Sequence, residues 1–389
     1  MIGTKLPGDR PASGPSSVET RNSEKADRAA EVAVERAIAE IRAARPVIVT
    51  GKEGAALAFP AEALDAEAAA WLGERAEGNM GLILSAPRLR YLGLDRVEPG
   101  RIALVSIDLE RIAELVSAVG VRLQDAVEPL DSIEAASLGL CRLALSLPAL
   151  VSMPIKARGA DYENLLSVTV EQARSYRVVK RRLLRIVGRA PVPLEGAPHS
   201  EFVVFRGGEG LRDQVAIIVG APDFAKPTTV RLHSACLTGD LFGSLKCDCG
   251  DQLRHTARLL AENGGGVLLY LDQEGRGNGL GNKIRAYCLQ AQGFDTYDAD
   301  QVLGFDHDHR GFAFAAEMLR QLGVARVRLM TNNPVKIAAL EDAGLEVVSD
   351  HRIVGRTTEQ NSGYLEAKRE RGGHLIEPSA ASSIGKIKG

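Results

Sequence analysis

Residues 251–292 read DQLRHTARLLAENGGGVLLYLDQEGRGNGLGNKIRAYCLQAQ. A short apolar run, GVLLYLD, lies between two segments whose apolar residues recur at helical spacing. The same alternation continues around it, with strands predicted at 214–220, 326–331 and 345–349 and helices at 311–323 and 334–344. Strands and helices that alternate at this spacing predict a mostly parallel or mixed sheet covered by helices.

The first half of the chain predicts α/β structure of its own. An alanine-rich amphipathic helix is expected over 29–44, followed by a buried strand at 46–50. Further strands are expected at 81–86 and 101–107, and helices at 66–76, 111–119 and 131–146. Between residues 177 and 198 a basic helical pattern gives way to Pro- and Gly-rich chain, which we interpret as a domain boundary.

The fold class predicted is therefore α/β (α+β), with two domains that each contain a mixed sheet covered by helices. The boundaries expected are a flexible tail at 1–28, domains at 29–190 and 191–376, and a second tail at 377–389. The length of 389 residues suits two domains of ordinary size.

Composition excludes several classes of function. The net charge of −2 provides no overall basic field for nucleic acid, and the apolar runs are interrupted by Arg and Pro, so no membrane span is expected. The N-terminal residues have no apolar segment of the signal-peptide kind, and we expect a cytoplasmic protein. In a reducing compartment, clustered cysteines indicate metal binding or catalysis more often than disulfides.

Three of the five cysteines lie in HSACLTGDLFGSLKCDCGDQL, residues 233–253, at the spacing C-x10-C-x-C. Structural zinc sites usually take all four ligands from the protein, whereas catalytic sites leave one position for water. Three thiols without a fourth favour a catalytic zinc site. The alternative is that His233 or His255 closes the site and makes it structural.

Three further segments carry polar groups suited to a ligand, although each has an ordinary structural interpretation. In YLDQEGRGNGLGNKIRAY (270–287), the glycines permit close backbone approach, and Arg276, Lys283 and Arg285 suit phosphates, but a plain surface loop fits too. In MTNNPVK (330–336), an Asn-Pro helix start follows a strand, which either binds an anion or simply begins a helix. LGFDHDHRGF (303–312) fits a second metal site, a solvated loop or an acid/base loop.

Together, RLHSACLTGD, KCDCGDQL, QEGRGNGLGNKIRAY, LGFDHDHR and TNNPVK resemble the GTP cyclohydrolase II family in order and spacing, over about residues 192–376. The resemblance implies one Zn²⁺ per chain on Cys236, Cys247 and Cys249, with a zinc-activated water that attacks C8 of GTP. It implies release of formate and pyrophosphate to give 2,5-diamino-6-(5-phosphoribosylamino)pyrimidin-4(3H)-one, the first step of riboflavin biosynthesis. Mg²⁺ on the triphosphate and a homodimer are also implied.

The resemblance also assigns roles to single residues. Asp308 matches the proton acceptor, and Tyr287 matches a tyrosine beside the reacting centre. Arg310 matches an arginine proposed to attack the α-phosphorus, with electrostatic support of that phosphate as the rival role. The positions that match nucleotide-binding residues are Arg231, His233, Ser234, Gln252, Glu274, Gly275, Arg276, Thr296, Thr331 and Lys336. His307 and His309, beside Asp308, are expected to be loop residues.

This chain departs from the family pattern at three positions: Ala235 stands where many members have Glu, Asp272 where they often have Arg, and Asn278 where they have a larger apolar residue. Ala235 and Asn278 are compatible with a paralogous cyclohydrolase that acts on a uridine nucleotide in uracil catabolism. A zinc-stabilised GTP-binding regulator without turnover is the third alternative.

The first half resembles dihydroxybutanone phosphate synthase, in AIAEIRAARPVIVT, GLILSAPRLRYLGL and SVTVEQARSYRVVKRRLLRIVGRAPVPL. That family has an acidic loop after its first strand, where this chain has GKEGAALAFPAEAL, and no histidine precedes His199. Carboxylate and histidine chemistry needs those groups. We therefore expect this half to be non-catalytic and to serve structure, dimer formation or regulation.

Overall fold

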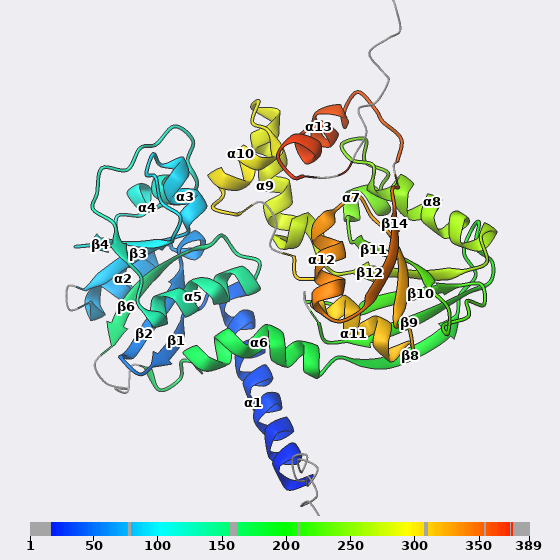
Figure 1. Cartoon of the computed structure of the whole chain (residues 1–389). Coiled ribbons are helices and arrows are strands. Elements are labelled where there is room, and N and C mark those ends of the chain that lie inside the picture. Colours follow the sequence, from blue (N-terminus) through cyan, green and yellow to red (C-terminus); the bar gives the residue numbers. More distant parts are fainter. Residues whose placement is uncertain are drawn as a thin grey trace, which may run out of the picture.

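The chain forms two seven-stranded mixed sheets, each covered by helices, in the computed structural model (Figure 1). The structure describes residues 17–76, 79–155, 162–208, 211–306, 310–353, 355–373 and 375. This arrangement confirms the predicted fold class.

The first sheet has the strand order β5-β4-β3-β6-β2-β1-β7 and is antiparallel except for the β1–β7 pair. Helices α1, α5 and α6 cover one face, and η1, α2, α3 and α4 lie on the other side of the sheet. Its elements are α1 (Ser17–Arg42), β1 (Val47–Gly51), β2 (Gly54–Pro60), η1 (Ala61–Ala63), α2 (Ala66–Arg75), β3 (Met80–Leu84), α3 (Ala86–Tyr91), β4 (Gly100–Leu104), α4 (Leu109–Ser117), β5 (Glu128–Pro129), α5 (Ser132–Leu143), β6 (Ala149–Ile155), β7 (Ser167–Thr169) and α6 (Val170–Arg182).

The second sheet has the order β14-β13-β11-β12-β10-β9-β8, in which the first four strands are parallel. Helices α11 and α12 cover one face, and α8 packs on the other. Its elements are β8 (Arg185–Pro191), β9 (Ser200–Arg206), β10 (Gln214–Val219), β11 (Thr228–Ser234), α7 (Leu237–Asp240), α8 (Cys249–Glu262), β12 (Gly266–Leu271), η3 (Glu274–Gly277), α9 (Gly279–Ala291), α10 (Thr296–Val302), α11 (Ala313–Gln321), β13 (Arg326–Met330), α12 (Pro334–Asp342), β14 (Glu346–His351) and α13 (Ser362–Glu370).

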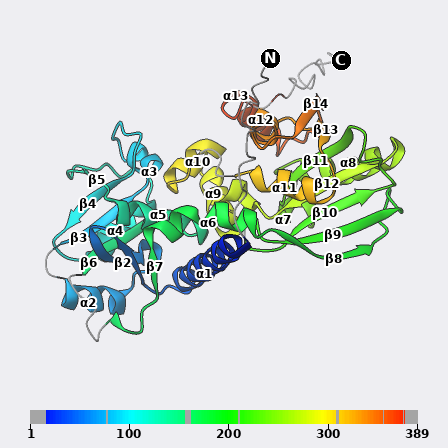
Figure 2. The same cartoon turned by 60° about the horizontal axis from the view of Figure 1, so that its bottom comes forward.

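Helices α9 and α10 lie between the two sheets in both views (Figures 1 and 2). Although they follow β12 in sequence, their apolar residues belong to the core of the first half. Leu289 and Val302 are buried in the same cluster as Leu82, Leu115 and Val151. The two halves therefore share part of one hydrophobic core.

Most predicted elements are present, with a difference at the N-terminal end of the chain. The first helix begins at Ser17, well before the expected Ala29, so residues 17–28 do not form the predicted tail. This segment is polar, which favoured the prediction of a tail. It also contains Glu, Lys, Arg and Ala, which have high helix propensity. The remaining residues of the two predicted tails, 1–16 and 377–389, lie outside the described residues.

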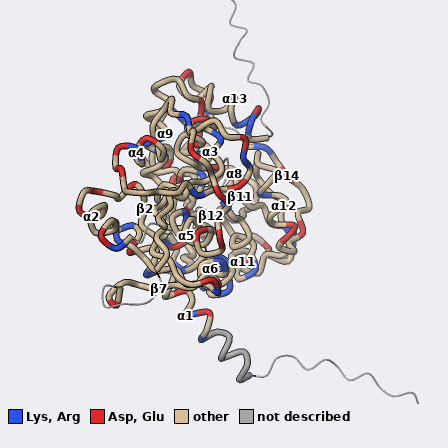
Figure 3. Tube along the Cα trace, turned by 90° about the vertical axis from the view of Figure 1, so that its left-hand side faces the viewer, with Lys and Arg blue, Asp and Glu red and all other residues tan. Residues whose placement is uncertain are grey.

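Charges of both signs are interspersed along the chain trace (Figure 3). Among the helices that the structure describes, none is both long enough and apolar enough to cross a membrane.

Candidate functional site

The site lies where the parallel strands of the second sheet end. Strand β11 leads to Cys236, β12 to Glu274, and β13 to Thr331. Because parallel strands direct their carboxyl ends to one edge, three separate sequence motifs meet there. One cavity is lined by all the described residues to which the family resemblance assigned a role: Arg231, His233, Ser234, Cys236, Cys247, Cys249, Gln252, Glu274, Gly275, Arg276, Tyr287, Thr296, Arg310, Thr331 and Lys336.

The three cysteines form a compact cluster. Their sulfur atoms all lie within 4.8 Å of one another, and the Cys236 and Cys247 sulfurs are 3.6 Å apart. Tetrahedral zinc with Zn–S bonds of about 2.3 Å holds sulfur ligands about 3.8 Å apart, so the cluster fits zinc. Gly239 makes this approach possible, since a Cβ there would lie 2.7 Å from the Cys247 sulfur.

Neither histidine considered as a fourth ligand belongs to the cysteine cluster. The Nε2 atom of His233 is 3.1 Å from Asp240 Oδ1, and burial lowers the pKa of this imidazole. His255 is exposed on α8. Within the described part of the chain, the group that could hold a metal at this place consists of the three cysteines alone. Neither His233 nor His255 therefore belongs to this cluster.

Lys283 places a cation against the thiols. Its Nζ atom is 3.1 Å from the Cys236 sulfur and 2.8 Å from Glu274 Oε1. The other Glu274 oxygen accepts a hydrogen bond of 2.6 Å from the backbone N–H of Leu237. Hydrogen bonds from Cys247 and Cys249, together with the nearby Lys283 ammonium, lower the pKa of Cys236. A thiolate at Cys236 is the form that binds a metal ion.

A buried polar chain links the sheet to the cysteine segment. Arg231 donates hydrogen bonds to Gln252 Oε1 and, at 3.0 Å, to the carbonyl of Met330. Gln252 in turn donates to Asp248 Oδ2 at 2.5 Å. Burial lowers the pKa of Arg231 to about 10, which still leaves it protonated at neutral pH. These contacts fix Asp248, which stands between Cys247 and Cys249.

The other wall of the cavity provides groups suited to phosphates. Arg276 forms an ion pair of 3.1 Å with Asp300, although its backbone has a φ of +60°. The Nη1 atom of Arg310 lies 3.2 Å from Ser234 Oγ. Asn333 caps α12 by accepting from the Val335 N–H at 3.0 Å, with Pro334 at the first helical position. The predicted helix N-terminus is therefore present at the cavity, as anion binding requires.

Comparison with known proteins agrees with this site. The family model of GTP cyclohydrolase II matches residues 185–352. The GTP cyclohydrolase-2 of Xylella fastidiosa is 42% identical over 356 residues, which cover 90% of this chain and 89% of that protein. The chain belongs to the GTP cyclohydrolase II family. The resemblance inferred from the motifs is thereby confirmed.

Two other similar proteins extend over different parts of the chain. The riboflavin biosynthesis protein RibBA of Chlorobium phaeovibrioides is 39% identical over 217 residues, covering 55% of this chain and 52% of that protein. The solved structure of RibBX, a two-domain 3,4-dihydroxy-2-butanone 4-phosphate synthase from A. baumannii, covers 83% of this chain and 99% of its own at 21% identity, with a TM-score of 0.31.

Some residues expected to act in this GTP cyclohydrolase II site lie elsewhere or outside the described residues. Asp308, with His307 and His309, lies outside them. Arg285, which was expected to suit phosphates, instead forms an ion pair of 2.6 Å with Glu62 of the first half. Its position two residues after Lys283 places it on another face of α9.

The three departures from the family pattern also have defined positions. Ala235 and Asn278 line the cavity. Asp272 Oδ2 accepts hydrogen bonds of 2.9 Å from the backbone N–H groups of Leu211 and Arg212. Asp272 thus anchors a loop.

Sequence reasoning missed several residues that line the cavity, among them Tyr364 and Lys368 on α13. The Lys368 Nζ atom is 4.1 Å from the Tyr364 ring centre and 3.8 Å from Asp248 Oδ1. The available signal was a Tyr and a Lys four residues apart, which share one helix face. No pattern in the sequence of α13 predicts that this helix lines the cavity.

Proposed function

We propose that this chain is a zinc-dependent GTP cyclohydrolase II that opens the imidazole ring of GTP and releases formate and pyrophosphate. Membership of the GTP cyclohydrolase II family supports the reaction. The observation that carries the zinc assignment is the cluster of three thiols, whose sulfur atoms lie within 4.8 Å of one another on the wall of the polar cavity. We place the reaction at the start of riboflavin biosynthesis.

Zinc held by Cys236, Cys247 and Cys249 would supply a water activated for attack on C8 of the guanine ring. The chain's own residues position this chemistry. Lys283 neutralises part of the thiolate charge at Cys236, from a distance of 3.1 Å. Tyr287 lines the same wall, and burial raises the pKa of its phenol, so it keeps the proton that a proton donor needs.

The polyphosphate would extend toward Arg276, Arg310 and the N-terminus of α12. Lys336 is 6% exposed, and its Nζ atom donates to the carbonyl of Leu232 at 2.7 Å, so its charge is fixed at the cavity wall. We assign Arg310 to electrostatic support of the α-phosphate, because a protonated guanidinium is a poor nucleophile. Mg²⁺ would neutralise the leaving pyrophosphate, and Asp308 remains the proposed proton acceptor.

The test measures formate and pyrophosphate from GTP and Mg²⁺ with zinc-loaded wild type, Cys247→Ser and Cys288→Ser. Cys288 is exposed and lies outside the cluster, so it is the matched control. We expect formate release by wild type and Cys288→Ser and its loss in Cys247→Ser, together with loss of bound zinc. Tight GTP binding by wild type without either product would refute the enzymatic proposal.

The same assay with UTP distinguishes the uridine alternative. Ala235 and Asn278 are at the cavity wall, where a change of base preference would arise. We expect GTP to be the preferred substrate, and a higher kcat/KM for UTP would reverse the assignment.

We further propose that the first half, within residues 29–190, does not catalyse the synthase reaction that its sequence resembles. Strands β1 and β2 pair directly through Gly51 and Gly54, which leaves a two-residue turn with Glu53 as its one acidic side chain. A turn of this length offers no place for several metal-binding carboxylates. Formation of dihydroxybutanone phosphate from ribulose 5-phosphate and Mg²⁺ by the purified protein would overturn this proposal. The homodimer and the cytoplasmic location stay predictions.

A further inference from the structure

Side chains of the first half form hydrogen bonds to the end of α10, a helix that lines the cavity. Arg88 on α3 is 1% exposed, and each of its guanidinium hydrogen bonds reaches a backbone carbonyl. Its Nε and Nη2 atoms donate to the last carbonyls of α4, at 2.7 Å to Leu115 and 2.7 Å to Glu114. Its Nη1 atom donates at 2.8 Å to the carbonyl of Val302, the last residue of α10.

This geometry joins the C-termini of two helices, one from each half, through a single buried cation. A helix C-terminus carries partial negative charge and unpaired carbonyls, so a buried guanidinium stabilises both ends at once. Burial lowers the pKa of Arg88 to about 10, and the side chain is still charged at neutral pH.

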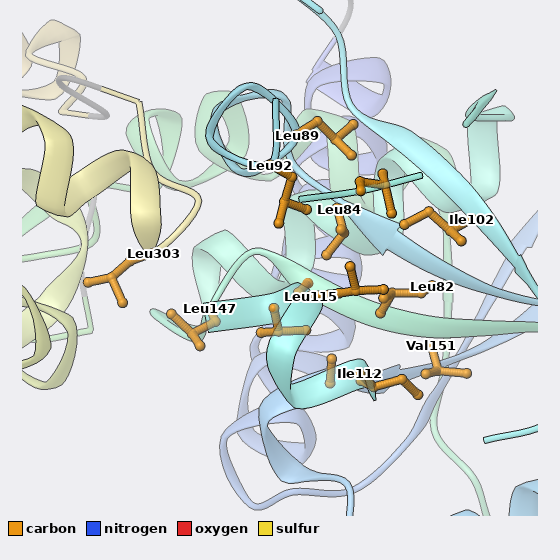
Figure 4. Close-up of a cluster of buried hydrophobic side chains, with 14 of the residues drawn as sticks. Leu82, Leu84, Leu89, Leu92, Ile102, Ile112, Leu115, Leu147, Val151 and Leu303 are labelled. Carbon is orange, nitrogen blue, oxygen red and sulfur yellow. The ribbon is translucent and has the colours of Figure 1, made fainter. Parts of the chain in front are cut away.

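A second contact fixes the chain just after α10. Ser85 Oγ donates a hydrogen bond of 2.6 Å to the carbonyl of Gly304. A Cβ on Gly304 would lie 2.8 Å from Ser85 Oγ, and its φ is +81°. Between these contacts, Leu303 belongs to the same buried cluster as Leu147 of the first half, and the two side chains are neighbours in the close-up (Figure 4).

Helix α10 carries two side chains that contact Arg276 at the cavity. Asp300, which pairs with Arg276 at 3.1 Å, is two residues before Val302. Tyr297, also on α10, stacks under the Arg276 guanidinium at 4.5 Å. These two α10 side chains therefore contact the Arg276 guanidinium directly, and Arg276 and Asp300 both line the cavity.

We propose that Arg88 and Ser85 are positioning residues for the nucleotide cavity, so that the first half of the chain sets the affinity of the second half for GTP. This inference rests on the proposed function. The first half would thus serve the second half's reaction without catalysing one, by fixing α10 and through it Arg276.

The test compares Arg88→Met, Ser85→Ala and the control Arg101→Met in the full-length, zinc-loaded protein. Arg101 is a largely buried arginine of the same half that also bonds to backbone carbonyls, but its partners, Glu128, Glu134, Asn79 and Met80, all belong to the first half. We expect Arg88→Met to raise the KM for GTP about tenfold or more, and Ser85→Ala to raise it less, because small misplacements of a binding group cost roughly 10–100-fold.

The KM is the readout that separates positioning from stability. Partial unfolding lowers the amount of active enzyme and hence the maximal rate, but leaves the KM of the folded molecules unchanged. Zinc content should remain at the wild-type value, because neither residue contacts the cysteines. Faster backbone hydrogen exchange at residues 296–302 in Arg88→Met, but not in Arg101→Met, would support the same conclusion.

A wild-type KM in both Arg88→Met and Ser85→Ala, or an equal rise in Arg101→Met, would overturn the inference. If wild type released no formate, the proposed function would fail separately. The GTP dissociation constant, measured by calorimetry on the same variants, then decides the inference: it stands if Arg88→Met weakens binding and Arg101→Met does not, and falls otherwise.

Discussion

Replacing Lys283 by Met should strongly destabilise the zinc-free protein, because it breaks a buried ion pair at the site. The Lys283 side chain is 11% exposed and that of Glu274 is 13% exposed, with 2.8 Å between Nζ and Oε1. Burial by itself would lower the pKa of Lys283, but the Cys236 thiolate and the Glu274 carboxylate raise it above its ordinary value. The lysine is therefore charged, and the carboxylate loses its cation in the variant.

Removing one partner of a buried pair costs about 3–5 kcal/mol, since the other charge stays buried without compensation. Glu274 keeps hydrogen bonds from the backbone N–H groups of Leu237, at 2.6 Å, and Gly275, at 3.1 Å, which places the expected loss in unfolding free energy toward the lower figure. Urea unfolding followed by circular dichroism measures this loss. The fluorescence of Trp71, the chain's one tryptophan, gives a second signal from the first half.

Two controls define the result. Lys226→Met removes an exposed pair with Asp223, with side chains 78% and 55% exposed, and should change stability very little. The double variant Lys283→Met/Glu274→Gln should recover much of the loss, because it removes the uncompensated charge. If Lys283→Met were as stable as Lys226→Met, the ion pair would carry no energy and the reasoning would be wrong.

Three further outcomes are expected. Gly239→Ala should lower the zinc content measured by atomic absorption, because its Cβ would lie 2.7 Å from the Cys247 sulfur, whereas Gly281→Ala, with no atom within 4 Å, should bind zinc normally. Lys368→Met should raise the KM for GTP about tenfold, the equivalent of one charge-assisted hydrogen bond, while Arg369→Met, which does not line the cavity, should leave it unchanged. Burial raises the pKa of Tyr176 from 10.0 to about 12, so the folded protein keeps a proton that the unfolded chain loses. Stability should therefore fall as pH rises through this window, by about 1.4 kcal/mol per pH unit more than in Tyr176→Phe, in urea unfolding at each pH.

The parts of the fold that could be predicted from sequence are those whose pattern is local. The fully buried strand β3 is a continuous apolar run and the half-buried helix α8 has helical periodicity, and both were found. Strand β11 was missed, although it lies at the centre of the second sheet and carries Arg231 and His233. Its sequence, TTVRLHS, places an arginine and a histidine at buried positions, which an apolar pattern does not anticipate.

The candidate site was easier to predict than the fold around it, because its chemistry is concentrated in short motifs. The cysteine spacing and the Asn-Pro helix start each predicted a feature that the structure contains. Lys283 and Arg285 show the limit of such reasoning. Both are basic residues in one motif, yet one contacts the thiols and the other pairs with Glu62, and only the helix orientation separates them.

The placement of α9 and α10 could not be predicted from sequence, because a hydrophobic pattern does not specify which other segment a buried face packs against. Leu289, Val302 and Leu303 predict a buried face, but the core that receives them is built by residues some two hundred positions earlier. The first half has no histidine and a two-residue turn between β1 and β2, and its α3 provides Ser85 and Arg88 to the segment beside the cavity. A domain can lose its catalytic side chains without loss of such contacts, since packing and backbone hydrogen bonds do not depend on them. On this argument, removal of the first half would expose an apolar face of α9 and α10 and release Arg276 at the same time, so the two halves are one functional unit.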